Sequence, residues 1–136
     1  MEERGLPIVR ELHRIAKGPD LPARKLEGAL EVLFGALGEV DAEFSGLILD
    51  GWMRAREDKR YRLTMAWLRE QMRLSVAEIL AEGVAAGAFA EDLDADAVAA
   101  VCLGAAEGAL LQTASHGGPV RADAILRALV QLATAR

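Results

Sequence analysis

The sequence predicts an all-α fold, an antiparallel bundle of about six helices. In nearly every segment between proline and glycine breaks, apolar residues recur at helical rather than alternating spacing. The hydrophobic fraction of 52% is rich in alanine and only 4% of residues are aromatic, a composition that favours helix packing over a sheet. A chain of 136 residues is long enough for one core and too short for two ordinary domains, so residues 1–136 are expected to form a single domain.

Three helices are expected in the first half of the chain. The first covers residues 7–16 and stops at a Gly-Pro break. The second runs over residues 20–38, with Asp20 as its cap and Pro22 in its first turn. The third begins near Asp41, because acidic residues favour a helix N-terminus, and it loosens where a charged stretch follows.

Three further helices are expected in the second half. A long one covers residues 59–86 and spans on the order of 40 Å, which makes it the central strut of the domain. Gly87 offers a left-handed cap at its end. A helix over residues 95–115 is apolar nearly all round and should be covered on more than one face, whereas the helix over 121–135 carries a single apolar stripe.

Composition and motifs argue against several classes of function. Sixteen basic against twenty-one acidic residues give a net charge of −5, which disfavours direct binding to nucleic acid. His13 and His116 lie far apart and outside any metal-type spacing, and the single Cys102 has apolar neighbours. Glu78 and Glu82 are expected to be solvated, and the charged stretch 54–62 is interpreted as a salt-bridged junction. No cofactor, metal site or enzymatic activity is predicted.

Gly104 and Gly108 stand four residues apart in the most apolar helix, a spacing known from membrane spans. Asp96 and Glu107 interrupt that apolar run, and a charge near the centre of a span costs roughly 2.5 kcal/mol or more. No basic flank or signal-type segment precedes any apolar run. The chain is therefore predicted to be cytoplasmic and not to bind a membrane.

The same two glycines predict a close contact between helices, because each weakens its helix by about 1 kcal/mol relative to alanine. An all-round apolar helix followed by an amphipathic one suggests a homodimer whose interface is a four-helix bundle built from residues 95–136. Glu107 should then lie at the edge of the packed face. The predicted interface consists of Val101, Gly104, Gly108, Leu111, Ile125, Leu129 and Leu132.

Aromatic and methionine side chains come mostly from the second, third and fourth predicted helices. Spacing alone favours an ordinary core. Pockets between helices are nevertheless lined by such residues, because thioethers and broad rings tolerate varied apolar ligands. The candidate ligand-binding residues, chosen from helix faces, are Leu33, Phe34, Leu37, Ile48, Trp52, Met65, Trp67, Leu68, Met72 and Cys102.

The run "ILAEGVAAGAFAEDLDADAVAAVCLGAAEGALLQ" covers residues 79–112. Within it, "EG" and "GAF" close the long helix, "DLD" opens the next and a second "EG" lies inside that one. This run resembles the C-terminal domain of TetR-family transcriptional regulators, and the resemblance extends more loosely over the whole chain. It implies a helical domain that dimerises and encloses a pocket for a small molecule.

In that family a three-helix head binds operator DNA, and the ligand releases it. Residues 1–18 resemble a remnant of the connecting helix, so no head and no direct DNA binding are expected in this chain. The resemblance implies a homodimeric domain that senses an apolar or amphipathic effector. The alternative is a headless interaction module that dimerises with a partner or a full-length relative without binding a ligand.

Overall fold

The computed structural model describes residues 2–35, 42–116 and 122–135, and over this part of the chain it contains helices and no strand. The predicted all-α fold is confirmed. Leu37, one of the predicted pocket residues, lies outside the described residues. The helices are α1 (Glu2–Lys17), α2 (Pro22–Leu33), α3 (Ala42–Ala55), α4 (Lys59–Ala85), α5 (Ala95–His116) and α6 (Ala122–Thr134).

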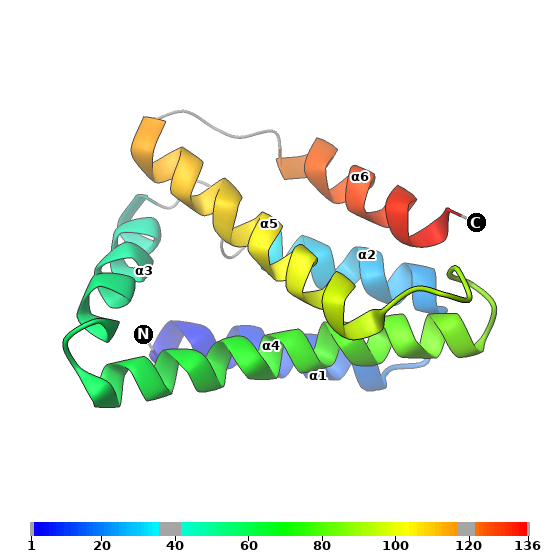
Figure 1. The fold of residues 1–136 in the computed structure, drawn as a ribbon, viewed down its shortest axis with the longest axis horizontal. Helices are drawn as coiled ribbons and strands as arrows, with labels where there is room; N and C mark the ends of the chain where they lie inside the picture. Colours follow the sequence, from blue (N-terminus) through cyan, green and yellow to red (C-terminus); the bar gives the residue numbers. More distant parts are fainter. Residues whose placement is uncertain (1, 36–41, 117–121, 136) are drawn as a thin grey trace.

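The long helix α4 organises the domain, as predicted, because α1, α2, α3 and α5 all pack against it. Figure 1 shows α1 alongside α4, α5 crossing in front of α2, and α3 standing at the end of the molecule where α4 begins. α6 packs on α2 and α5. The N-terminal halves of α1 and α4 therefore meet α3 and α5 at one end of the domain.

Local capping explains both ends of α4 and the start of α5. Gly87 adopts φ +77° directly after α4, as its position in the sequence predicts. Asp94 Oδ1 accepts a hydrogen bond from the backbone N–H of Ala97 at 3.1 Å and opens α5. Asp58 caps α4 by accepting from the backbone N–H of Arg60 at 3.0 Å, a role that the interpretation as a salt-bridged junction missed.

Two boundary predictions for the first helices are wrong. Leu21, not Asp20, precedes α2, and no side chain caps that helix, although Pro22 does stand in its first turn. α1 starts at Glu2 and contains Pro7, so the proline does not mark its beginning. The extra turns matter because they bring the start of α1 against α4.

The turn after α4 is held in place by an aromatic side chain that packs against the helix. Phe89 is 2% exposed, and its ring lies so close to α4 that a Cβ atom at Gly83 would stand 2.1 Å from Phe89 Cδ2. The backbone N–H of Ala88 donates to the carbonyl of Gly83 at 2.8 Å. Gly83 is therefore required by contact with Phe89 and not by helix propensity.

A buried lysine ties three helices together. Lys25 of α2 is 4% exposed, and its Nζ donates to the carbonyl oxygen of Ala16 at 2.9 Å and to Glu82 Oε2 at 2.8 Å. The carboxylates predicted to be solvated are thus both paired, since Glu78 forms a salt bridge with Lys17. These contacts hold the C-terminal ends of α1 and α4 against α2.

Replacing this lysine should destabilise the domain clearly. In Lys25→Met the Ala16 carbonyl loses its donor and Glu82 its cation, so the free energy of unfolding should fall by about 1–3 kcal/mol. Lys17→Met is the matched control, because the pair of Lys17 with Glu78 is exposed and such pairs contribute about 0–1 kcal/mol. Urea unfolding followed by circular dichroism measures both, and equal effects would contradict the role given to Lys25.

Candidate functional site

A cavity of about 40 Å³ lies where α1, α3, α4 and α5 meet. Its wall is almost entirely apolar. The residues that line it are Gly5, Ile8, Ile48, Trp52, Met65, Leu68, Arg69, Met72, Leu103, Glu107 and Leu110. Two wider hollows, beside α1 and α2 and beside the turn after α4, have much more polar walls, so the apolar cavity is the better candidate for a binding site.

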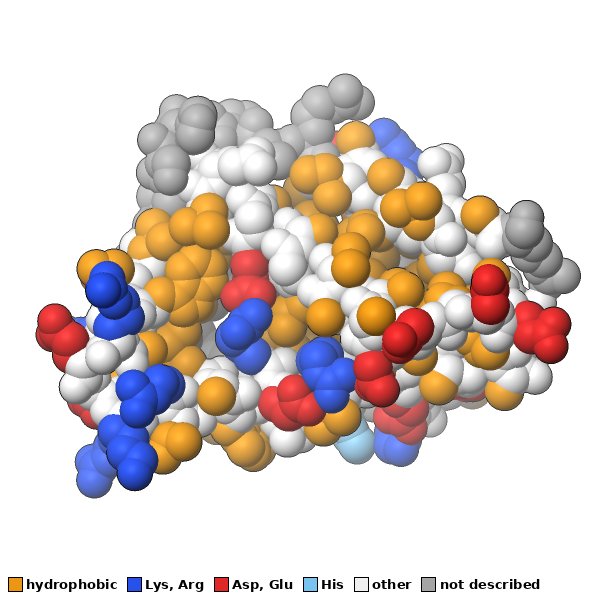
Figure 2. Space-filling view, in the orientation of Figure 1, with side chains coloured by type: hydrophobic (Ala, Val, Ile, Leu, Met, Phe, Trp, Pro, Cys, Tyr) orange, Lys and Arg blue, Asp and Glu red, His pale blue; other side chains and the backbone are white. Residues whose placement is uncertain are grey.

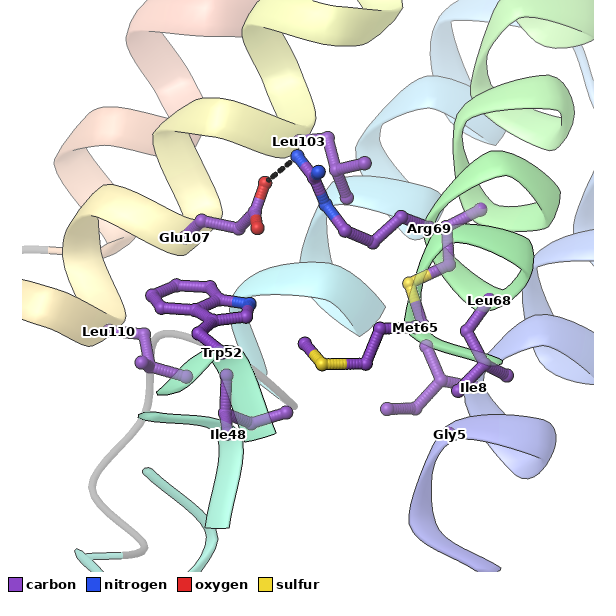
Figure 3. Close-up of a pocket in the computed structure, with 11 residues that line it drawn as sticks. Gly5, Ile8, Ile48, Trp52, Met65, Leu68, Arg69, Leu103, Glu107 and Leu110 are labelled. Atoms are coloured by element: carbon purple, nitrogen blue, oxygen red, sulfur yellow. Dashed lines mark hydrogen bonds and ion pairs between the residues drawn. The ribbon is translucent and has the colours of Figure 1, made fainter. Parts of the chain in front are cut away.

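Helical spacing places these side chains on facing stripes. Residues four apart on α3, Ile48 and Trp52, share one face of that helix, and residues 65, 68 and 72 share one face of α4. α5 contributes Leu103, Glu107 and Leu110 at the same kind of spacing. Figure 3 shows the ring of Trp52 between the α5 side chains and Met65. The site is therefore assembled from elements that are regular on their own.

The α1 contribution was not predicted. Gly5 approaches α4 so closely that a Cβ atom there would stand 2.9 Å from Leu68 Cδ1. Three residues on, Ile8 faces the same cavity. The signal in the sequence is this glycine and isoleucine at i,i+3 spacing, but its meaning depends on α1 extending upstream of Pro7.

Two charged residues face each other at the edge of this apolar wall. Arg69 Nη2 of α4 donates to Glu107 Oε1 of α5 at 2.7 Å (Figure 3). The Glu107 side chain is 16% exposed and that of Arg69 is 54% exposed. Glu107 was expected at the edge of a face packed on a partner, but it lines the cavity and is paired within its own chain. Neither residue was predicted to line a pocket.

The structure brings half of the predicted ligand-binding residues together around the cavity, namely Ile48, Trp52, Met65, Leu68 and Met72. Leu33, Phe34 and Cys102 are buried in the core but do not line the cavity. Spacing thus identified lining residues of α3 and α4 but none of the α5 residues that share a face there, Leu103, Glu107 and Leu110. Spacing did not distinguish residues of the core from residues that line the cavity, because both kinds are buried and apolar.

Trp67 does not line the cavity and is 50% exposed. It follows Met65 by two positions, which turns its side chain about 200° around the helix from the cavity. Leu63 and Leu74 are exposed on the same outer side of α4. The sequence shows two apolar stripes on this helix, and the periodicity does not indicate which one faces the core.

The Cys102 thiol is enclosed by the core, and burial raises its pKa to about 11. The folded state therefore favours the protonated thiol, and this group's contribution to stability is complete below pH about 9 and lost as the pH rises to about 11. At pH 8 the native chain should react with a thiol reagent at least about 100-fold more slowly than the chain unfolded in urea. Equal rates would show that Cys102 is accessible.

The outer face of α5 carries the two glycines singled out in the sequence. A Cβ atom at Gly104 or Gly108 would have no neighbour within 4 Å, so nothing in the described part of the chain explains either glycine. Val101 beside them is 58% exposed and Leu111 is 40% exposed. Figure 2 shows hydrophobic side chains at the surface over α5.

α6 continues this apolar surface. Leu132 is 72% exposed, whereas Ile125 and Leu129 are half-buried against the core. By length and composition, Ala95–Gln112 of α5 could also cross a membrane, with 33% of its residues buried in the fold. The core helix of a soluble protein meets the same criteria, so this is weak evidence for a membrane span.

Comparisons with known proteins give one result. A family model described as "BetI-type transcriptional repressor, C-terminal" matches residues 22–135, from the first turn of α2 to the end of α6. The match includes α3, α4 and α5 but not α1. Among curated proteins and solved structures, no significant similarity to the chain is found. Within the described ranges, no group of three His, Cys, Asp or Glu residues is arranged to hold a metal ion.

Proposed function

The chain belongs to the family of TetR-type repressors with this BetI-type C-terminal domain, and we propose that it is a domain that senses a ligand and forms a homodimer. The family consists of transcriptional regulators, so the output is control of DNA binding by a helix-turn-helix head. The ligand is a small apolar or amphipathic molecule. The chain works in the cytoplasm, without a cofactor and without chemistry on the ligand.

The observation that carries the sensing role is the apolar cavity between α1, α3, α4 and α5. Ligand pockets are mostly apolar with a few placed polar groups, and this cavity has Trp52 and two methionines in its wall beside one ion pair. Methionine side chains adapt to different ligand shapes at little cost. Because the present volume is about 40 Å³, side chains must move apart when a ligand enters.

The cavity is also well placed to transmit binding. Its wall includes Gly5 and Ile8 of α1, which we propose to be the connecting helix, and Glu107 of α5, which adjoins Gly108 on the proposed dimer face. A ligand that separates α4 from α1 or α5 therefore changes the placement of α1 and of the partner subunit. Such coupling requires that the ligand bind one arrangement more tightly than the other.

The dimer role is supported by the exposed apolar face of α5 and α6. Two glycines that weaken α5 without any neighbour in the described chain are accounted for by a second copy packed against them. Contiguous exposed apolar surface of this kind marks an interaction site. A two-fold axis beside Gly104 and Gly108 would pair α5 and α6 with their counterparts in a four-helix bundle.

A thermal-shift screen with apolar and amphipathic compounds tests the sensing role. We expect some compounds to raise the melting temperature of the wild-type chain, and to do so much less in Ile48→Phe, which adds volume at the cavity wall. Leu63→Phe on the exposed side of α4 is the matched control and should respond like wild type. A dimer that no compound of a broad panel stabilises would count against sensing.

The second candidate function is a pure interaction module. It is favoured by the small volume of the cavity, because a domain that only dimerises needs no space for a ligand. Such a module would form mixed dimers with a full-length relative and interfere with its DNA binding. Co-expression with a relative, followed by affinity purification through one tagged chain, detects mixed dimers, and the ligand screen separates the two functions.

A further inference from the structure

The polar groups in the cavity wall restrict the kind of ligand that fits, an inference that rests on the proposed sensing function. Among the cavity-lining residues that the structure describes, Arg69 and Glu107 are the only ones with charged side chains. A charged group on a bound ligand therefore meets this pair, whereas a neutral acceptor can also meet the indole N–H of Trp52. A buried polar group without a partner is costly, so the pair determines which ligand head groups are accepted.

The two partners differ in their freedom to move. Arg69 has a long side chain that is 54% exposed, and it reaches from α4 across to α5 (Figure 3). It can turn into water while its guanidinium stays hydrated, and a half-exposed ion pair opposes this movement only weakly. The Glu107 side chain is 16% exposed and has no such route. If one partner yields to a ligand, it is Arg69.

The small volume of the cavity also favours displacement of the Arg69 side chain. One water molecule needs about 10–15 Å³, so a cavity of about 40 Å³ holds few atoms beyond small solvent. A larger molecule must displace part of the wall. The other walls, such as Leu68, Leu103 and Leu110, are buried core residues whose displacement would expose apolar surface. Displacing the Arg69 side chain opens the cavity without that cost.

We propose that Glu107 is the residue that selects and orients the ligand, and that Arg69 is the side chain that the ligand displaces. The ligand is an amphiphile whose polar end donates hydrogen bonds, such as a hydroxyl, an amide or a protonated amine. Its donor replaces Arg69 on Glu107, and its apolar part lies along Trp52 and Met65. An amphiphile with a carboxylate at its end is rejected, because that group would face Glu107.

Three probes with the same eight-carbon tail test this assignment by calorimetric titration at pH 7: 1-octanol, octylamine and octanoate. We expect octanol and octylamine to bind the wild-type chain, and octylamine to bind at least tenfold more tightly than octanoate. In Glu107→Gln this ratio should fall to about twofold or less. Glu70→Gln is the matched control, because Glu70 pairs with Arg73 on the same helix and does not line the cavity, and it should keep the wild-type ratio.

Arg69→Gln gives a second readout that keeps Glu107 in place. It should tighten the binding of octanol and octylamine several-fold, because no arginine has to leave. Weaker binding of both probes in this variant would overturn the assignment. Equal affinity of the wild-type chain for octanoate and octylamine would also overturn it while leaving ligand sensing intact, whereas binding of none of the three probes would overturn both.

Discussion

The variant Gly104→Leu/Gly108→Leu should lose the proposed dimer while each subunit keeps its fold. Two leucine side chains on the outer face of α5 prevent close approach of the partner helix, so the dimer dissociation constant should rise by about 100-fold or more. Over the described residues of the subunit, a Cβ atom at either position meets nothing within 4 Å, and leucine is a better helix former than glycine by about 1 kcal/mol. Sedimentation velocity over a range of concentrations measures the dissociation constant.

Ala81→Leu is the control for this variant, since Ala81 is an exposed small residue on α4, away from the α5 and α6 face. It should leave the dimer unchanged. A double-leucine variant that sediments as a stable dimer would show that the subunits associate elsewhere. The exposed outer side of α4, with Leu63, Trp67 and Leu74, would then be the surface to examine.

Gly83→Ala should destabilise the subunit by steric overlap with Phe89. The new methyl group would stand 2.1 Å from the ring of Phe89, which is 2% exposed. Overpacking of this kind costs about 1–3 kcal/mol, and the backbone N–H groups of Ala88 and Phe89 that bond to the Gly83 carbonyl would move with the ring. We expect a net loss of about 2 kcal/mol, or a midpoint lower by about 1 M in urea.

A second substitution isolates the contact. Phe89→Leu removes the ring edge, so the double variant Gly83→Ala/Phe89→Leu should be less destabilised than the sum of the two single variants. Gly46→Ala on α3 is the matched control, because none of the described residues lies within 4 Å of a Cβ atom there, and it should stabilise the chain by up to about 1 kcal/mol. Additive effects of the two single variants would contradict the steric explanation.

Local signals were sufficient for most of the fold. α4, predicted over 59–86, is observed over Lys59–Ala85, and α5 begins at Ala95 as predicted. These boundaries depend on caps and on Gly87, which act over a few residues of the chain. The start of α1 was missed for the opposite reason, since its first turns are held by contact with α4 and not by a local signal.

The site could be predicted only in part, because it depends on which helices become neighbours. Trp52 and Met65 were identified, since each lies on a stripe that any packing of its helix would bury. The pairing of Arg69 with Glu107 joins residues 38 positions apart, and nothing in the spacing of either helix indicates it. Trp67 was wrongly assigned to the pocket, because helical spacing alone does not show which of two apolar stripes is covered by other helices.

The two tryptophans allow the most direct test of ligand sensing at this cavity. Trp52 lines it, whereas Trp67 lies on the outer side of α4. With a compound from the thermal-shift screen, the variant Trp67→Phe, which reports Trp52, should show a saturable change in fluorescence at the compound's stabilising concentrations. The variant Trp52→Phe, which reports Trp67, should show none. A response from Trp67 alone, or from neither tryptophan, would contradict a ligand site between α1, α3, α4 and α5.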